Sequence, residues 1–293
     1  MSKKITVTGA TGNIASLVIP TLLEKGAQVK ALVRNPSKAE ELKKSGVEIV
    51  EGEFTDADAA QKVMEGADSV LLIAPPNPDA VKQNSSLITA AKNSGNPYVV
   101  RISAIGAAAD APTENGKLHH QSDNELAESG LPHTILRPHF FMQNLFMSVP
   151  TIMEQGQMYW GMGDARLGLV DVRDIADCAA VILLEGGHEG KIYTPTGSAS
   201  ISFKDIAGII SKAIGKEVTY TPVSYDAVKQ SIIEMGWGEW GGQIMYDYSK
   251  AYSEGWGDFV NDDVETITGN KARSVEQFVN EVLSHAFQNK TGA

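Results

Sequence analysis

The fold of this chain follows from one short stretch near its beginning, Lys4-Ile5-Thr6-Val7-Thr8-Gly9-Ala10-Thr11-Gly12-Asn13-Ile14-Ala15, where an apolar strand pattern passes through a glycine turn into a helical pattern. Gly9 can adopt the backbone angles of a tight turn, and Gly12 lets the main chain approach a pyrophosphate. Ala15, in place of a third glycine, is small enough for close helix-to-strand packing. The free N–H groups at the helix start face an anion. We therefore expect a dinucleotide held by Gly9, Thr11, Gly12, Asn13 and Ile14.

Strand and helix patterns alternate along the first half of the chain. Strands are expected at residues 5–8, 28–33, 47–50, 69–73, 98–103 and 133–136. Helices are expected between them, the first ending at Lys25 and the others at 36–44, 56–65, 78–94 and 115–129. Such alternation, with nearly continuous apolar strands, is typical of a parallel sheet covered by helices on both faces. We predict an α/β fold with a Rossmann-type doubly wound parallel sheet, in which ligands bind beyond the carboxyl ends of the strands.

The alternation loosens beyond Arg137-Pro138. A helix near 142–153 and a short strand at 158–160 come first, and a helix at 173–184 and a strand at 191–194 then return to the main sheet. From Ser200 onward the pattern is mostly helical, with one short strand at 218–221. We predict a nucleotide-binding domain of residues 1–150, joined by 165–195, and a smaller, mostly helical C-terminal lobe of residues 151–164 and 196–293.

Composition excludes several classes of partner. The chain has 293 residues and a formal net charge of −11, from 25 basic and 36 acidic side chains, so a general affinity for nucleic acid or an anionic membrane is not expected. No apolar run is long enough to span a bilayer, no signal-peptide pattern precedes the first strand, and the single Cys178 allows no disulfide within the chain. We expect a cytoplasmic protein with a small-molecule partner and no metal, and a homodimer is left open.

The end of the second strand predicts which dinucleotide binds. A site that prefers NAD usually has an acidic residue there, which accepts hydrogen bonds from the ribose hydroxyls. This chain has Arg34, whose guanidinium can hold a phosphate through a forked pair of hydrogen bonds, and Lys38 adds a second positive charge one turn later. The alternative is that Arg34 is a solvated surface residue. We predict NADP(H) as the cofactor.

Two more loops follow strands at the same edge of the sheet. Phe54, after the third strand, is expected to flank the adenine, while Asp56 caps the next helix. Ala74 and Pro75 follow the fourth strand, where small and rigid residues leave room for the ribose and pyrophosphate. Prolines at this place also end a strand, and both interpretations are compatible.

These motifs, with several further ones, resemble the atypical short-chain dehydrogenases, in particular the NmrA-like NAD(P)-binding family, nearly end to end. The other matching segments are Ser129-Gly130-Leu131-Pro132, Thr134-Ile135-Leu136-Arg137-Pro138, Phe140-Phe141-Met142-Gln143-Asn144, Asp171-Val172-Arg173-Asp174-Ile175-Ala176, Gly190-Lys191-Ile192-Tyr193 and Phe203-Lys204-Asp205-Ile206-Ala207. The resemblance implies either a reductase, since the family includes NADPH-dependent quinone and triphenylmethane-dye reductases, or a regulator that binds the nucleotide without turnover.

A catalytic pair that is common in the short-chain dehydrogenases is absent. Ketone reductases of that class have a tyrosine four residues before a lysine on the helix after strand five, and the lysine lowers the pKa of the tyrosine. Counting back from Ser129-Gly130, these two positions fall on Asn115 and His119. His119 is a candidate catalytic residue because imidazole titrates near neutral pH. The alternative is that His119 is tied to Asp123, four residues further along the helix.

Residues after strands five and six are expected near the nicotinamide. Ser103 ends strand five and either holds the carboxamide or closes the strand. His139 and Phe140 follow strand six, His139 as a second catalytic candidate and Phe140 as a cofactor contact, and Phe141 is expected on the substrate side. For Phe141 packing in the core is a good alternative. Ser103 is the last residue of its expected strand, and the other three residues lie beyond the carboxyl end of theirs.

The aromatic residues of the small lobe suggest a flat substrate wall. Trp237, Trp240 and Tyr246 are the substrate candidates, with Tyr252 and Trp256 nearby in sequence. Aromatic walls suit planar conjugated ligands, although tryptophans in a small helical lobe also fill its core.

Together these patterns predict an NADPH-dependent reductase that transfers hydride directly to a planar conjugated substrate, with a quinone as the leading candidate. A quinone can accept hydride without a dedicated proton donor at the instant of transfer, because the charge spreads over the conjugated system. The alternative is an NADP(H)-sensing regulatory protein without turnover. An epimerase that uses bound NAD is disfavoured by Arg34 and by the absent tyrosine.

Overall fold

The structure, a computed structural model, describes residues 2–288 and divides into two compact units. Unit 1 combines the chain up to Ala111 with Asn115–Pro138 and Ile175–Thr194. Unit 2 combines Pro112–Glu114, His139–Asp174 and the chain from Pro195 onward.

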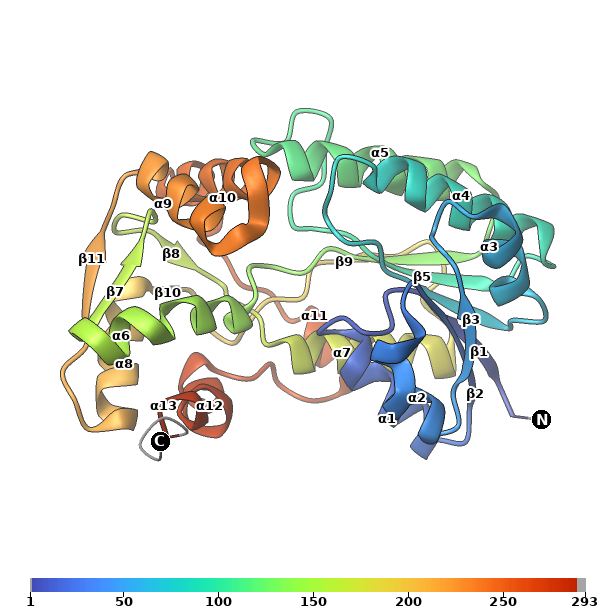
Figure 1. Ribbon diagram of the computed structural model, residues 1–293, viewed down its shortest axis with the longest axis horizontal. Helices are drawn as coiled ribbons and strands as arrows, with labels where there is room; N and C mark the ends of the chain where they lie inside the picture. Colours follow the sequence, from blue (N-terminus) through green and yellow to red (C-terminus); the bar gives the residue numbers. More distant parts are fainter. Residues whose placement is uncertain (1, 289–293) are drawn as a thin grey trace. The chain divides into compact units, whose positions relative to one another are not determined.

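Unit 1 is built on one parallel sheet of seven strands in the order β3-β2-β1-β4-β5-β6-β9 (Figure 1). The strands are β1 (Lys4–Val7), β2 (Gln28–Val33), β3 (Glu48–Glu51), β4 (Ser69–Leu72), β5 (Tyr98–Ile102), β6 (His133–Leu136) and β9 (Ile192–Tyr193). This confirms the predicted Rossmann-type doubly wound sheet. The strand order reverses between β1 and β4, which places a switch point beside the glycine turn.

Helices cover both faces of this sheet. They are α1 (Ala15–Glu24), the 3-10 turn η1 (Pro36–Ala39) with α2 (Glu40–Lys44), α3 (Ala57–Met64), α4 (Ala80–Asn93), α5 (Glu114–Glu128) and α7 (Val172–Glu185). In Figure 1, α3, α4 and α5 lie on one face, and α1, α2 and α7 lie on the other. Leu87 of α4 and Leu126 of α5 pack in one buried cluster with Val70 of β4 and Val99 of β5. Because both faces are covered, the central strands read as continuous apolar runs.

Unit 2 has its own hydrophobic core, which includes Trp160, Phe203, Tyr252 and Phe278. Its helical elements are η2 (Met142–Ser148), α6 (Val149–Gln155), α8 (Phe203–Ile214), α9 (Tyr225–Ile232), the π-helical η3 (Ile233–Trp237), α10 (Gly238–Ser253), α11 (Asp263–Thr268), α12 (Val275–Phe278), the π-helical η4 (Val279–Leu283) and α13 (His285–Gln288). Four short strands, β7 (Gln157–Trp160), β8 (Arg166–Leu167), β10 (Ile201–Ser202) and β11 (Thr219–Pro222), form the pairs β7–β11 and β8–β10. The β8–β10 pair was not predicted, because two-residue strands leave no periodicity in the sequence.

The division between the units differs from the predicted one in four places. Residues 112–114, 139–150, 165–174 and 195 belong to unit 2, whereas the prediction assigned them to the nucleotide-binding domain. Met142 and Leu145 are fully buried in the core of unit 2, which explains why the chain changes unit directly after Pro138. The predicted return of 191–194 to the main sheet is confirmed by the pairing of β9 with β6.

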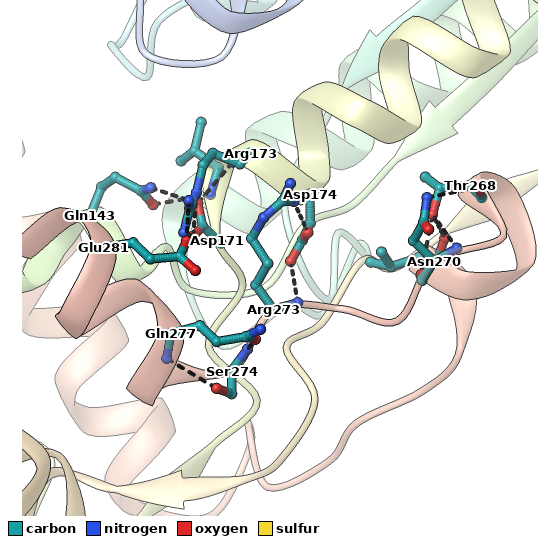
Figure 2. Close-up of polar contacts among 12 residues, drawn as sticks. Gln143, Asp171, Arg173, Asp174, Thr268, Asn270, Arg273, Ser274, Gln277 and Glu281 are labelled. Carbon is teal, nitrogen blue, oxygen red and sulfur yellow. Dashed lines mark hydrogen bonds and ion pairs between the residues drawn. The ribbon is translucent and has the colours of Figure 1, made fainter.

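The segment Asp171-Val172-Arg173-Asp174, which the sequence singled out, forms a polar network within unit 2 (Figure 2). Asp171 is fully buried and accepts hydrogen bonds from the main-chain N–H of Arg173 and from the Gln143 side chain, both at 2.9 Å. Arg173 also reaches Glu281 at 2.6 Å, and Asp174 pairs with Arg273. The motif therefore anchors the start of α7 to the C-terminal helices, which is a structural role.

Candidate functional site

The glycine turn has the geometry expected of a phosphate-binding turn. Gly9 has φ +63°, and a Cβ there would lie 3.1 Å from both the carbonyl oxygen and the Cβ of Ile73. The N–H of Gly12 donates to the carbonyl of Gly9 at 2.9 Å, which closes the turn directly before α1. A side chain at Gly9 would therefore be strained by its φ and crowded by the neighbouring strand end.

The turn also presents unused hydrogen-bond donors, which is the feature that fits a pyrophosphate. Thr11, Gly12 and Asn13 are exposed, and within residues 2–288 the main-chain N–H groups of Thr11, Asn13 and Ile14 have no acceptor. The first N–H groups of a helix point along its axis and carry its partial positive charge. The residues present therefore fit an anionic dinucleotide, in the place where the sequence predicts one.

Arg34 follows β2 directly and is exposed. It makes no hydrogen bond or ion pair with any other residue that the structure describes, so its guanidinium is available to a phosphate. The side chain of Lys38 lies outside the described part of the structure, and its role stays a prediction.

The other predicted cofactor contacts of unit 1 divide into buried and exposed ones. Phe54 is 7 % exposed and packs in the same core cluster as Leu87 and Leu126, so packing already accounts for it and the adenine contact stays a prediction. Asp56 caps α3 as expected, through hydrogen bonds from the main-chain N–H groups of Asp58 and Ala59. Ala74 is half-buried and Pro75 is exposed, directly after β4.

Ser103 belongs to a buried charged cluster at the carboxyl ends of β5 and β6. Its hydroxyl donates to Oδ2 of Asp123 at 2.8 Å. The same oxygen accepts from Nε of Arg137 at 3.0 Å, and Oδ1 pairs with Nη1 of Arg101. The side chains of Arg101 and Asp123 are 1 % and 2 % exposed, and that of Arg137 is 20 % exposed. We call Arg101, Asp123 and Arg137 the ion cluster.

His119 contacts this cluster through an arginine. Its Nδ1 lies 3.3 Å from Nη2 of Arg101, whereas the expected alternative was a contact with Asp123, whose carboxylate instead binds Ser103 and both arginines. Burial, together with the positive charges of Arg101 and Arg137, lowers the pKa of His119 to about 3. The ring is neutral at physiological pH, so the predicted catalytic role has to be that of a neutral imidazole.

His139, the second catalytic candidate, lies in the core of unit 2 and is 1 % exposed. Its Nε2 donates to the carbonyl of Gly257 at 3.0 Å, and its Nδ1 accepts from the N–H of Phe140 at 2.7 Å. The ring stacks on Tyr252 at 5.7 Å, and burial lowers its pKa to about 4. Both nitrogens are used within unit 2, which gives the ring a structural role, and its catalytic role stays a prediction.

The predicted aromatic residues of unit 2 also divide into buried and exposed ones. Phe140 is 7 % exposed and packs edge-on against Trp160 and Tyr252, and Tyr252 itself is fully buried. Trp237 is 57 % exposed. The remaining substrate candidates, Phe141, Trp240 and Tyr246, are half-buried, and Tyr246 contacts Tyr225.

Unit 2 also contains a mostly apolar cavity of about 250 Å³, which does not involve these candidates. It is lined by Met147, Ser148, Thr151, Tyr159, Trp160, Val223, Ala227, Val228, Ser231, Ile232 and Met235. Its size suits a small aromatic molecule. The lining comes from η2, β7 and α9 together, a combination that no local sequence pattern indicates.

Two residues of the ion cluster were not singled out from the sequence. Arg101 lies in the otherwise apolar strand β5, and a charge in the middle of a buried strand is a signal that a buried partner exists. Arg137 was quoted only as part of the Thr134–Pro138 motif. The sequence contains both arginines, but it does not show which carboxylate pairs with them.

Comparison with known proteins agrees with this architecture. The model of the NmrA-like family matches residues 1–278. The chain belongs to the NmrA-like family. Its relatives include an NAD(P)H azoreductase of Xenophilus azovorans, 35% identical over 274 residues that cover 94% of this chain and 96% of the relative. The family predicted from the sequence is thereby confirmed.

Two solved structures of enzymes are similar to this NmrA-like chain over nearly its whole length. The NADPH-dependent quinone oxidoreductase of Escherichia coli, crystallised with NADPH, gives a TM-score of 0.87 at 26% identity and covers 95% of this chain and 99% of its own. The triphenylmethane reductase of Citrobacter sp., crystallised with NADP(H), gives 0.84 at 27% identity, with 94% and 99% covered. Within residues 2–288, no helix is both long and apolar enough to cross a membrane.

Proposed function

We propose that this protein is an NADPH-dependent reductase that transfers hydride directly to a planar conjugated acceptor, with a quinone as the leading candidate. The observation that carries the proposal is the exposed glycine turn, whose free main-chain donors and neighbouring Arg34 suit a phosphorylated dinucleotide. The named relatives support the same cofactor and reaction class, because they include an azoreductase, a quinone oxidoreductase and a dye reductase.

The cofactor is NADP(H), and its pyrophosphate and its 2′-phosphate are bound by different groups. The turn from Gly9 to Ile14 binds the pyrophosphate through main-chain N–H groups at the start of α1. Arg34 binds the 2′-phosphate, which a carboxylate at the same place would repel. When bound, NADPH supplies the hydride.

The acceptor is a conjugated molecule because the chain lacks the tyrosine–lysine pair on α5. Asn115 and His119 occupy those positions, and neither side chain is an acid that can protonate an isolated ketone at neutral pH. A quinone needs no proton at the moment of hydride transfer. Orientation of the two reactants and exclusion of water then supply most of the rate enhancement.

The test is stopped-flow oxidation of NADPH by the purified protein with a panel of benzoquinones, naphthoquinones and azo dyes. We expect turnover well above the rate in buffer for at least one quinone, and slower turnover with NADH at equal concentration. Tight NADPH binding with no acceptor-dependent oxidation on any member of the panel would refute the reductase and favour the NADP(H)-sensing regulator instead.

A further inference from the structure

The ion cluster carries more positive than negative charge. Arg101 and Arg137 both contact the carboxylate of Asp123. Guanidinium groups stay protonated in proteins, so two positive charges meet one negative charge. Burial lowers the pKa of Arg101, and Asp123 is the group whose charge opposes this effect. A buried excess charge is costly to fold, and such charges are concentrated at functional sites.

Two further observations point to an unused positive site. The Nε–H of Arg101 is buried and has no acceptor within residues 2–288. Nη2 of Arg101 lies 3.3 Å from Nδ1 of His119, and burial, together with the positive charges of Arg101 and Arg137, lowers the pKa of His119. The electrostatic field at His119 is therefore positive.

The contact with Arg101 also determines which nitrogen of His119 carries the proton. A guanidinium can only donate hydrogen bonds, so Nδ1 of His119, 3.3 Å from Nη2 of Arg101, must be the acceptor. The neutral ring then carries its proton on Nε2. His119 therefore offers its Nε2–H as a hydrogen-bond donor, while its Nδ1 contacts the positively charged Arg101.

The position of the cluster in the fold matches the acceptor end of the site. Ser103 follows β5 and Arg137 follows β6, at the carboxyl ends where this type of sheet binds ligands. Arg34 follows β2, on the other side of the switch point between β1 and β4. Because a dinucleotide lies across the switch point, an adenosine half at β2 places the nicotinamide half toward β5 and β6.

We propose that the ion cluster, acting through the Nε2–H of His119, stabilises the negative charge that hydride transfer creates on an oxygen of the acceptor. The proposal rests on the proposed function. A quinone that takes up a hydride gains one hydrogen nucleus and two electrons and becomes a hydroquinone monoanion, which water then protonates, while the cofactor is released oxidised. His119 is the catalytic residue and donates a hydrogen bond without giving up its proton. Arg101, Asp123 and Arg137 are positioning residues.

The kinetic test compares acceptors that end with different charges. A quinone becomes an anion, whereas a cationic triarylmethane dye becomes neutral. His119→Phe keeps a planar ring without the donor, and it should lower kcat for the quinone about 100-fold, the usual cost of removing one oxyanion donor, while changing kcat for the dye less than twofold. His119→Gln restores an N–H donor and should recover most of the loss. His120→Phe, one residue along α5, is the matched control and should change neither rate.

A variant of a positioning residue extends this test, and one result would overturn the proposal. Arg137→Gln removes one positive charge and keeps an amide that can donate to Asp123, so it should lower kcat for the quinone about tenfold and lower kcat for the dye by a clearly smaller factor. Equal losses for quinone and dye in His119→Phe would overturn the proposal, because the donor would then act on something other than the acceptor's negative charge.

Two measurements without turnover separate this inference from the proposed function. ¹⁵N NMR of His119 at pH 7 should show Nε2 protonated and Nδ1 unprotonated. A nitrophenol bound to the protein–NADP⁺ complex should titrate about one pH unit lower than in His119→Phe, because the cluster stabilises its phenolate. The Nδ1–H tautomer, or equal nitrophenol pKa values in the two proteins, would overturn the inference. If the NMR and nitrophenol results are as expected but no acceptor is reduced, the reductase assignment is refuted instead.

Discussion

The glycine turn and the ion cluster lie at the same edge of one sheet and are built in opposite ways. The turn is exposed, comes from consecutive residues and offers main-chain N–H groups. The cluster is buried and gathers Arg101 and Arg137 around Asp123, from 22 and 14 residues away. In the proposed function the turn acts through the shape of the backbone, whereas the cluster acts through charge that burial makes effective.

This difference determines how each region responds to substitution. A side chain added at Gly9 lies 3.1 Å from the carbonyl oxygen and the Cβ of Ile73, so the effect is steric and falls on cofactor binding and local strain. Removing the carboxylate of Asp123 from the cluster leaves both arginines without a counter-charge, so the effect falls on the stability of unit 1. The predictions below separate the two responses.

The largest effect is expected for Asp123→Asn. This change removes the carboxylate from between Arg101 and Arg137 and leaves one buried and one half-buried guanidinium group without a counter-charge. The free energy of unfolding should fall by about 3–5 kcal/mol, measured by urea denaturation at pH 7.5. Glu128→Gln, an exposed site in the last turn of the same helix, should change it by less than about 0.5 kcal/mol. A loss as small as the control's would mean that the cluster is not a buried ion network.

Arg34→Ala tests the exposed edge of the proposed cofactor site. Losing charge-assisted hydrogen bonds to a phosphate should weaken NADPH binding by about 2 kcal/mol, or about 30-fold in Kd, and leave the Kd of NADH nearly unchanged. Calorimetric titration with both nucleotides measures the two values. Arg166→Ala removes another exposed arginine, from unit 2, and should affect neither. Equal weakening for NADPH and NADH would refute the phosphate contact of Arg34.

Gly9→Ala tests the turn through a matched pair of glycines. Gly9 and Gly26 both have positive φ, at +63° and +80°, but a Cβ meets Ile73 only at Gly9 and finds nothing within 4 Å at Gly26. Each alanine should cost about 1–2 kcal/mol of stability through its φ. Only Gly9→Ala should also weaken NADPH binding, because its turn is the one that presents donors. An unchanged Kd in Gly9→Ala would place the pyrophosphate elsewhere.

The same contrast explains what the sequence could predict. Strand, turn and helix of the first βαβ unit are adjacent residues whose periodicity and glycines are local, and β2 and β6 occur at the predicted residues. The seven-stranded sheet and the return of β9 follow from the same alternation. Local patterns suffice wherever the structure depends on neighbouring residues.

Contacts between distant residues were not predictable in this way. His119 was correctly placed on α5, but its partner is Arg101 on β5, and no spacing along the helix indicates that contact. His139 and Phe140 follow β6 as expected, yet the chain changes unit at this point and both side chains enter the core of unit 2. Tyr252 likewise packs in that core, because aromatic residues in a small lobe are needed to fill it.

The smallest effect expected is a pH dependence of the free energy of unfolding. The buried histidines contribute to it and the glycine turn does not. The folded-state pKa values of His119 and His139 are about 3 and about 4, below the 6.5 of an unfolded histidine. Between these values the unfolded chain binds more protons than the folded one, so stability is present above pH 6.5 and is lost as the pH falls below it. Each ring should contribute a loss of about 1 kcal/mol between pH 6.5 and 5.5.

Urea denaturation at pH 7.5, 6.5 and 5.5 measures this slope. His119→Gln and His139→Gln each remove one titrating ring and should each flatten the slope, whatever they do to stability at pH 7.5. His285→Gln, at the exposed start of α13, is the control and should leave the slope unchanged. If His119→Gln left the slope as it is, His119 would be protonated equally in the folded and unfolded states. Neither burial nor the charges of the ion cluster would then disfavour the protonated form of its ring.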